Sequence, residues 1–146
     1  MENKLPILAI TMGDPSGIGP EIAAKSVNEK SIYDICKPLV IGDASVMEQA
    51  VKIANVPLKV RAVENVSKAK FEYGIMDVID LKNTDISKLE HGKVQAMSGN
   101  AAFQAVKKAI ELALNNEVDG TVTGPLNKES MNLAGYHYSG HTEIYA

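Results

Sequence analysis

A near-continuous apolar run close to the start of the chain, residues 6–12 (Pro-Ile-Leu-Ala-Ile-Thr-Met), restricts the possible folds more than any other feature. Such a run is typical of a strand that is buried on both faces of a parallel sheet. A turn with three Gly and two Pro follows at residues 13–21, and an apolar helical face comes after it. This order of strand, turn and helix predicts the first unit of an α/β fold.

The same order repeats along the chain. Apolar runs predict four further strands, at residues 38–42, 58–63, 76–81 and 118–123. In the run at 58–63, Lys59 and Arg61 alternate with apolar residues, which is typical of an edge or half-exposed strand. We therefore expect one α/β domain over residues 1–146, with a mainly parallel sheet flanked by helices and right-handed crossovers.

Helix and loop signals complete this outline. The clearest helical pattern covers residues 101–115, where apolar side chains recur on one face. Ser45 and Glu48 have the form of a capping box at the start of another helix. The polar, Gly-containing residues 83–99 are expected to form a long loop, and loops of that length are often functional.

Composition excludes several classes of protein. The net charge of −3 and the absence of a basic stripe argue against nucleic-acid binding. The single cysteine, Cys36, cannot form an internal disulfide and is expected to be a small core residue. No apolar run approaches the ~18 residues of a membrane span, and the N-terminus lacks the apolar segment of a signal peptide, so we expect a cytoplasmic protein.

Basic residues are almost all lysine, since Arg61 is the one arginine in the chain. Planar, bidentate capture of a phosphate or carboxylate usually uses Arg. If the ligand is an anion, it must be held by backbone amides, by Lys, or by residues outside this chain.

The glycine-rich turn is a candidate ligand loop. Its spacing, Gly13-x3-Gly17-x-Gly19, lies between a strand and a helix, where backbone amides can hold an anion. The spacing fits neither the G-x-G-x-x-G fingerprint nor the Walker loop. Asp14 and Ser16 add polar groups, and the sequence alone leaves a ligand loop and a tight structural turn equally open.

A second polar segment follows the last predicted strand, which stops at Gly124-Pro125. In a parallel sheet, ligands bind beyond the carboxyl ends of the strands, so Lys128 and His141 lie where chemistry is expected. Lys128 is the candidate catalytic residue, although a solvated surface lysine would look the same. Both loops follow strands, and we expect them to face the same edge of the sheet.

The histidines near the end favour substrate binding over metal binding. His137 and His141 have the spacing of two ligands on one helical face, but the residues between them are poor helix formers and His-Glu-x-x-His is absent. His141 and Thr142 are better read as hydrogen-bonding groups for a substrate, with Thr142 also a possible helix N-cap. No Gly-x-Ser-x-Gly nucleophile elbow occurs, so a hydrolase triad is not indicated.

Three motifs together resemble a known family. They are Ile10-Thr-Met-Gly-Asp-Pro-Ser-Gly-Ile-Gly-Pro-Glu-Ile22, Thr123-Gly-Pro-Leu-Asn-Lys128 and Leu133-Ala-Gly-Tyr-His-Tyr-Ser-Gly-His-Thr-Glu-Ile-Tyr-Ala146. The chain resembles, from end to end, the 4-hydroxythreonine-4-phosphate dehydrogenases of pyridoxal phosphate biosynthesis and their relatives acting on threonate or erythronate 4-phosphate. The resemblance implies an isocitrate/isopropylmalate-dehydrogenase-like fold, a homodimer with active sites at the subunit interface, NAD as hydride acceptor, and a divalent metal (Zn, Mg or Co).

By the same resemblance, His141 and Thr142 correspond to the family's substrate-binding His-Thr pair, and Lys128 would line the same cleft. The implied reaction is oxidation of a secondary alcohol by hydride transfer to NAD, followed by decarboxylation. Family members are about twice as long, and their metal-binding histidines, basic phosphate-binding residues and nucleotide site lie largely beyond residue 146. We therefore expect an N-terminal part of a dehydrogenase, with no metal ligands in this chain and with the cofactor-binding residues unassigned.

Two other interpretations stay open. One alternative to the dehydrogenase is that the 146-residue chain is a non-catalytic α/β module that binds ligand weakly or associates with a copy of itself. An acyl- or phosphotransferase on a similar scaffold is a third interpretation, which independence from NAD would support.

Overall fold

The computed structural model describes residues 4–138 and 140–146, and in it five parallel strands form one sheet in the order β3-β4-β2-β1-β5. The strands are β1 (Ile7–Thr11), β2 (Lys37–Gly42), β3 (Lys59–Val63), β4 (Ile75–Asp80) and β5 (Gly120–Val122). All five predicted strands are confirmed, and β3 lies at an edge of the sheet, as its alternating pattern predicted. The predicted α/β class with a parallel sheet is therefore correct.

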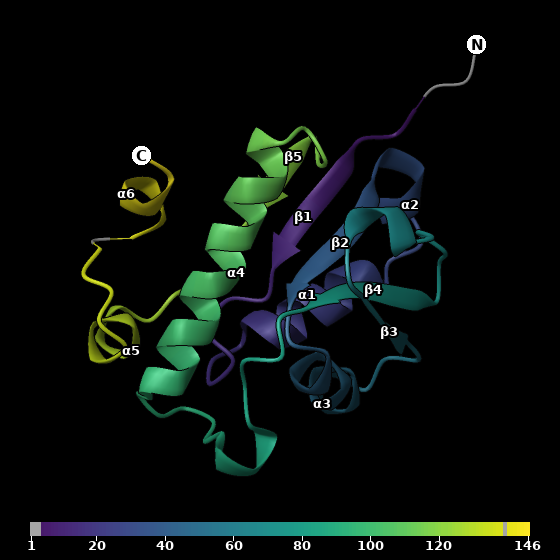
Figure 1. The fold of residues 1–146 in the computed structure, drawn as a ribbon. Helices are drawn as coiled ribbons and strands as arrows, with labels where there is room; N and C mark the ends of the chain where they lie inside the picture. Colours follow the sequence, from purple (N-terminus) through teal and green to yellow (C-terminus); the bar gives the residue numbers. More distant parts are fainter. Residues whose placement is uncertain (1–3, 139) are drawn as a thin grey trace.

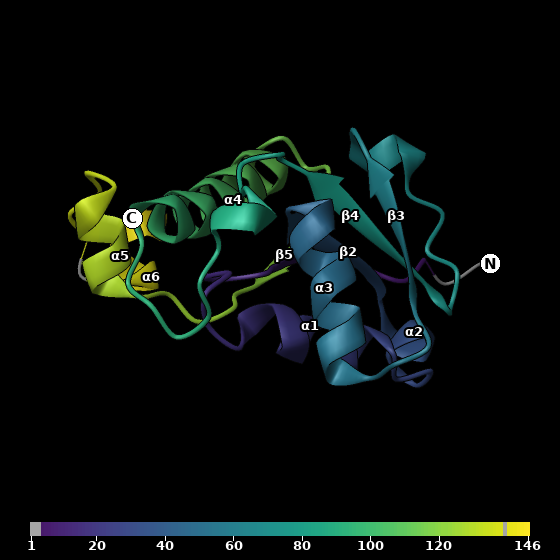
Figure 2. The ribbon, with the colours of Figure 1, turned by 90° about the horizontal axis from the view of Figure 1, so that it is seen from below.

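Helices cover both faces of this sheet. Figure 2 shows α4 (Ala96–Leu114) on one side and α1 (Gly19–Val27) with α3 (Ala44–Ala54) on the opposite side. Shorter helices are α2 (Ile32–Ile35), α5 (Lys128–Leu133) and α6 (His141–Tyr145), with single 3-10 turns η1 (Val66–Lys68) and η2 (Ile86–Lys88). Figure 1 shows α5 and α6 together at one side of the molecule, beyond α4.

Each face of the sheet buries its own apolar cluster. The larger cluster lies under α1 and α3, and its main members are Met12, Val27, Val40, Val46, Met47, Met76 and Val78. The second lies under α4, and its main members are Ala9, Leu39, Ile41, Ile79, Ala105, Ala109 and Leu112. The central strands β1 and β2 contribute to both clusters, which explains why their sequences are apolar without alternation.

Two sequence predictions need correction here. Helix α4 begins at Ala96, so the predicted loop at 83–99 ends earlier and the predicted helix at 101–115 starts too late. The first turn of α4 contains Ser98 and Gly99, which are buried although they are not apolar. A search for a repeating apolar face therefore does not detect this turn. Helix α3 is capped by Asp43 and not by Ser45, because the Asp43 carboxylate accepts hydrogen bonds from the Ser45 and Val46 amides.

None of the helices in the described ranges is both long and apolar enough to cross a lipid bilayer.

The contact between α4 and α5 depends on Gly99. A Cβ atom at this position would lie 2.0 Å from the carbonyl oxygen of Ser130 and 2.5 Å from the amide nitrogen of Met131. Backbone therefore packs directly on backbone where α5 crosses the first turn of α4. This contact fixes the segment that leads from β5 to the end of the chain.

We predict that Gly99→Ala destabilises the protein by about 1–3 kcal/mol, because the added methyl group forces the two backbones apart. Thermal or urea unfolding measures the effect. Gly17→Ala is the matched control, since a Cβ atom there meets its nearest neighbour, the Asp14 carbonyl oxygen, at an ordinary 3.4 Å. Equal stability of the two variants would contradict the close packing described here.

Candidate functional site at the carboxyl rim

The carboxyl ends of the strands form one edge of the sheet, because all neighbouring strands run parallel. We call this edge the carboxyl rim and define it by three loops. They are residues 12–18 after β1, residues 81–95 after β4, and residues 123–127 after β5. The sequence places polar and glycine residues in all three.

The first and third loops touch through their backbones. The Asp14 amide donates a hydrogen bond to the Pro125 carbonyl at 2.9 Å, and the Gly124 amide donates to the Thr11 carbonyl at 3.2 Å. A Cβ atom on Gly13, whose φ is +76°, would lie 2.6 Å from the Pro125 carbonyl oxygen. Glycine is therefore required at position 13 for the left-handed conformation and for the close approach. The prediction that the two loops share an edge of the sheet is correct.

A buried polar network attaches the second loop to the first. The Gly92 amide donates to the Ser16 carbonyl at 2.7 Å. The Ser16 hydroxyl lies 2.6 Å from the Ser98 hydroxyl and donates to the Gln95 side-chain oxygen at 3.2 Å. The Gln95 backbone amide in turn donates to the Ser130 hydroxyl at 3.1 Å. These bonds join the three loops to the starts of α4 and α5 and so hold the rim in one arrangement.

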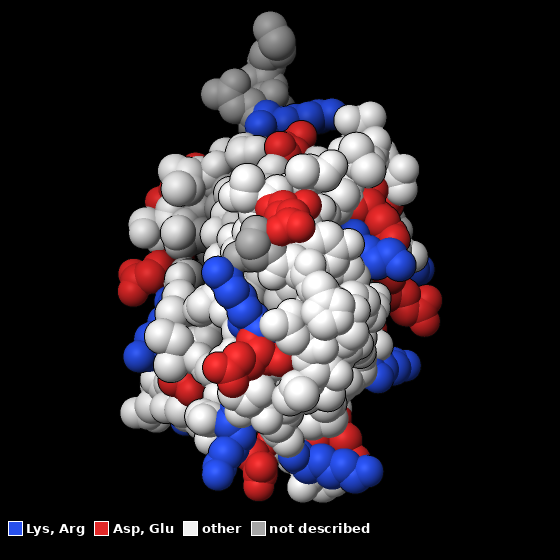
Figure 3. All heavy atoms as spheres, turned by 90° about the vertical axis from the view of Figure 1, so that its left-hand side faces the viewer, with Lys and Arg blue, Asp and Glu red and all other residues white. Residues whose placement is uncertain are grey.

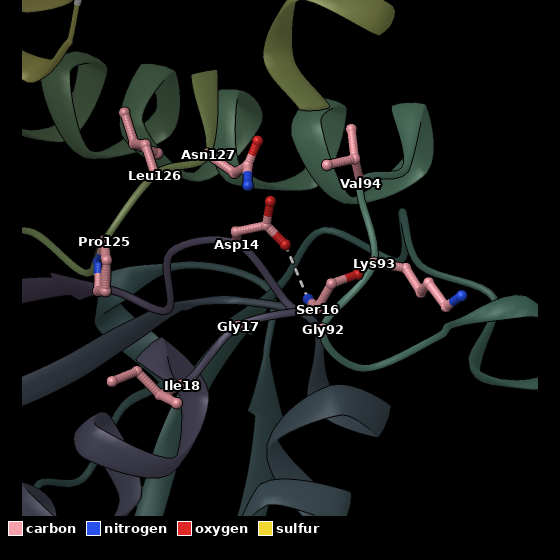
Figure 4. Close-up of a pocket in the computed structure, with 10 residues that line it drawn as sticks. All are labelled: Asp14, Ser16, Gly17, Ile18, Gly92, Lys93, Val94, Pro125, Leu126 and Asn127. Atoms are coloured by element: carbon pink, nitrogen blue, oxygen red, sulfur yellow. Dashed lines mark hydrogen bonds between the residues drawn. The ribbon is translucent and has the colours of Figure 1, made fainter. Parts of the chain in front are cut away.

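The three loops enclose a pocket of about 350 Å³, within the range of small-ligand sites. Figure 4 shows the residues that line it. They are Asp14, Ser16, Gly17, Ile18, Gly92, Lys93, Val94, Pro125, Leu126 and Asn127. Apolar side chains form much of the wall, and a few polar groups face the space between them.

Asp14 is the buried acidic group of this pocket and is only 5% exposed. Its Oδ1 accepts a hydrogen bond from the Ser16 amide at 2.8 Å, whereas its Oδ2 has no hydrogen-bond partner. Burial raises the pKa of Asp14 above its usual value, and the Ser16 amide and the nearby Ser130 hydroxyl act in the opposite direction. In Figure 4 the free oxygen points toward the side chain of Asn127.

His141, at the start of α6, lies against Gly124 near the start of the third loop. Burial lowers the pKa of its imidazole, and a hydrogen bond with the Gly124 backbone opposes this shift. Its Nε2 is buried and has no hydrogen-bond partner. Helix α6 is held beside β5 by the Tyr145 hydroxyl, which donates to the Thr121 hydroxyl at 3.1 Å. His141 therefore has a buried ring nitrogen without a hydrogen-bond partner near the rim.

The structure brings together some of the predicted site residues and separates others. Of the candidate ligand loop, Asp14, Ser16 and Gly17 line the pocket, while Gly13 and Gly19 pack closely against neighbouring backbone. Lys128, His141 and Thr142 do not line it. Lys128 is the exposed first residue of α5, just after the pocket residue Asn127.

Thr142 is not a helix N-cap, so that prediction was wrong. Helix α6 begins one residue earlier, at His141, and Gly140 occupies the cap position without a side-chain hydrogen bond. Thr142 instead lies exposed in the first turn, beside His141.

Sequence reasoning missed Lys93, Val94 and Asn127 as pocket residues. Lys93 and Val94 lie in the long polar loop, which the sequence marked as of functional interest without singling out any residue. Asn127 carried a clearer signal, since it caps α5 by accepting a hydrogen bond from the Ser130 amide at 2.9 Å. An Asn two residues after the strand-ending Gly124-Pro125 could have identified it.

Metal ligands do not converge in the parts of the chain that the structure describes, because no three His, Cys, Asp or Glu side chains lie close enough to share an ion. His137, the other candidate, has its Nδ1 3.2 Å from the Asn132 side-chain oxygen. The described residues therefore do not fit a divalent metal.

We predict that His141 titrates below the ordinary histidine value of about 6.5, because burial disfavours the charged imidazole. Neutral His141 then contributes stability above pH 6.5, and this stability is lost as the pH falls from there through the lower folded-state pKa. Proton NMR of the ring across this pH range measures the midpoint, with His141→Gln to assign the signal. A midpoint at or above 6.5 would contradict the buried environment.

Comparison with known proteins gives a consistent result. The family model described as pyridoxal phosphate biosynthetic protein PdxA matches residues 34–146. A Fusobacterium nucleatum protein assigned as a D-threonate 4-phosphate dehydrogenase is 50% identical over 137 residues, which is 94% of this chain and 41% of that protein. A Clostridium botulinum protein with the same assignment is 46% identical over 100% of this chain and 44% of its own length.

Solved structures agree with these relatives. The crystal structure of a 4-hydroxythreonine-4-phosphate dehydrogenase from Burkholderia phymatum superposes with a TM-score of 0.96 at 44% identity, covering 99% of this chain and 43% of that one. The enzyme of that name from Klebsiella pneumoniae superposes with a TM-score of 0.89 at 36% identity, covering 99% of this chain and 44% of that one. The chain thus spans less than half the length of these relatives. From the family match and these identities, we conclude that the chain belongs to the PdxA family.

Proposed function

We propose that this chain is part of an NAD- and divalent-metal-dependent dehydrogenase that oxidises and decarboxylates a 4-phosphorylated hydroxy acid, such as 4-phosphohydroxy-L-threonine or D-threonate 4-phosphate. The observation that carries the proposal is the superposition, at a TM-score of 0.96, on a solved 4-hydroxythreonine-4-phosphate dehydrogenase. Relatives assigned as D-threonate 4-phosphate dehydrogenases support the same class of substrate.

The proposed reaction has two steps, an oxidation and a decarboxylation. The secondary alcohol gives a hydride to NAD⁺ and releases a proton, which leaves a carbonyl group β to the carboxylate. The bond to the carboxylate then breaks, CO₂ leaves, and the remaining electron pair takes up a proton. When bound, NAD⁺ supplies the acceptor for the two electrons.

The chain's own contribution is substrate binding at the rim. The lowered pKa of His141 keeps its imidazole neutral near pH 7, and its unpartnered Nε2 can hydrogen-bond a substrate oxygen. The exposed Thr142 hydroxyl beside it offers a second hydrogen bond. Lys128 is an exposed cation that can attract the anionic substrate. The metal would need ligands from outside the described residues.

We also propose a second copy of the protein as the partner. Figure 3 looks onto the side of the molecule where α5 and α6 lie and shows a broad uncharged area there. Exposed apolar side chains of α5, α6 and the segment between them include Leu133, Tyr138 and Tyr145. A surface of this kind favours association between copies.

The activity test is NADH formation by the longest open reading frame that encodes this chain, with the 146-residue chain assayed in parallel. The assay contains NAD⁺, a divalent cation (Zn²⁺, Mg²⁺ or Co²⁺), and in turn 4-phosphohydroxy-L-threonine and the 4-phosphates of threonate and erythronate. We expect His141→Ala to raise the KM for the phosphorylated acid about tenfold or more, since a substrate hydrogen bond is lost, and to leave the KM for NAD⁺ within about twofold.

His91→Ala is the matched control, because His91 is exposed and its ring hydrogen-bonds Gln49 on α3. A protein of full family length that reduces NAD⁺ with none of the three acids would contradict the proposal. Activity in the longer protein but not in the 146-residue chain would show that this chain alone is a non-catalytic module.

A further inference from the structure

Asp14 Oδ2 is a buried carboxylate oxygen that faces a pocket and has no hydrogen-bond partner among the described residues. Buried polar atoms are nearly always paired, since an unpaired one loses its hydration without compensation. The other oxygen of the same group is fixed by the Ser16 amide, so the carboxylate cannot turn without breaking that bond. The Ser130 hydroxyl is close enough to act on the Asp14 pKa but forms no hydrogen bond with Oδ2, so the pocket that Asp14 lines is where a ligand can supply the missing partner.

We infer that Asp14 binds a ligand directly, and that the pocket takes an uncharged group carrying an N–H or O–H donor, which Asp14 Oδ2 accepts. The donor would supply the hydrogen bond that the folded protein leaves open. The inference uses the proposed function only to name two candidate ligands.

The pocket walls support an uncharged ligand group. Ile18, Val94, Pro125 and Leu126 present apolar surface, which suits a ring or a carbon chain. A phosphate group would meet the Asp14 carboxylate and be repelled by it. Lys93 also lines the pocket, but Figure 4 shows its ammonium end directed away from Asp14. The phosphate of the proposed substrate is therefore held elsewhere.

The position of Asp14 is fixed by the whole rim, which is what a binding group requires. Its amide is bonded to Pro125, and its neighbour Ser16 is bonded to Gly92 and Ser98. Each of the three loops thus contributes to placing one oxygen atom. A surface turn with no role in binding does not need this arrangement.

Two ligands of the proposed reaction carry the required donor. One is NAD⁺, through its amino, carboxamide or ribose hydroxyl groups, and the other is the phosphorylated acid, through its hydroxyl groups. The chemistry that Asp14 recognises is the same in both, and measurement of each ligand separately identifies the source.

The test compares Asp14→Asn with the wild-type protein, encoded by the longest reading frame, in calorimetric binding to NAD⁺ and, separately, to D-threonate 4-phosphate. In the variant, the side-chain oxygen keeps the hydrogen bond from the Ser16 amide, and an NH₂ group replaces Oδ2. This NH₂ group and the N–H or O–H group of the ligand are both donors, so the hydrogen bond is lost. We expect the Kd for one of the two ligands to rise about 10- to 100-fold and the other to stay within about twofold.

Asp85→Asn is the matched control. Asp85 accepts a hydrogen bond from the amide two residues later, that of Ser87, at 3.0 Å, just as Asp14 accepts one from the Ser16 amide. The Asp85 side chain, however, is 51% exposed and does not line the pocket. We expect its Kd values to match wild type. Asp14→Asn is expected to melt no lower than wild type at pH 7, because burial raises the pKa of Asp14 and the variant removes a disfavoured charge.

A second pair of variants keeps the test valid if Asp14→Asn does not fold. Ile18 is 61% exposed and lines the pocket, while Ile22, one turn further along α1, is 47% exposed and does not. Ile18→Glu is expected to weaken the same ligand about tenfold or more, and Ile22→Glu to leave it unchanged.

Several results would overturn the inference. They are unchanged Kd values in Asp14→Asn, equal loss for both ligands, or wild-type protein that binds neither ligand. Failure of the proposed function looks different. In that case the wild-type protein forms no NADH, yet one ligand still binds and still depends on Asp14.

Discussion

The close backbone contact between Gly13 and Gly124-Pro125 is the constraint on which the rest of the rim depends. A Cβ atom on either glycine would come within 2.8 Å of a backbone oxygen of the facing segment. The contact joins the loop after β1, near the start of the sequence, to the loop after β5, more than a hundred residues later. Once these loops are joined, Asp14, Asn127 and the Gly124 contact of His141 all lie at one edge of the sheet.

Burial and polarity oppose each other at this edge. Ser16, Ser98 and Ser130 are buried and hydrogen-bonded, so they stabilise the rim as a connected network. Asp14 Oδ2 and His141 Nε2 are buried as well, but they remain without partners. Unsatisfied polar atoms in a well-ordered network cost stability, and such a cost is typical of positions where a ligand completes the bonding.

Much of the fold was predictable because burial on both faces leaves a simple pattern. The strands at β1 and β2 are apolar without alternation, and β3 alternates because it lies at the edge. The start of α4 was not predictable in this way, since Ser98 and Gly99 are buried for polar bonding and close packing. The N-cap of α3 was also predicted wrongly, because Asp43 and Ser45 are both good capping residues and the structure uses Asp43.

The candidate site was less predictable than the fold. The sequence indicated the ligand loop containing Asp14, and the rule for parallel sheets placed it beside residues 123–127. It could not show which polar atoms are left unpaired, because that depends on contacts such as Ser16 with Ser98, 82 positions apart. Nor could it identify Lys93 and Val94, which line the pocket next to Gly92, whose amide is bonded to the Ser16 carbonyl of the first loop.

We infer from these contacts that the loops after β1 and β5 form a single ligand site. A crystal structure of the protein encoded by the longest reading frame, grown with NAD⁺ and D-threonate 4-phosphate, tests it most directly. We expect a bound ligand in hydrogen-bond contact with residues of both loops, Asp14 among them. Ligands bound at full occupancy without touching either loop would contradict it.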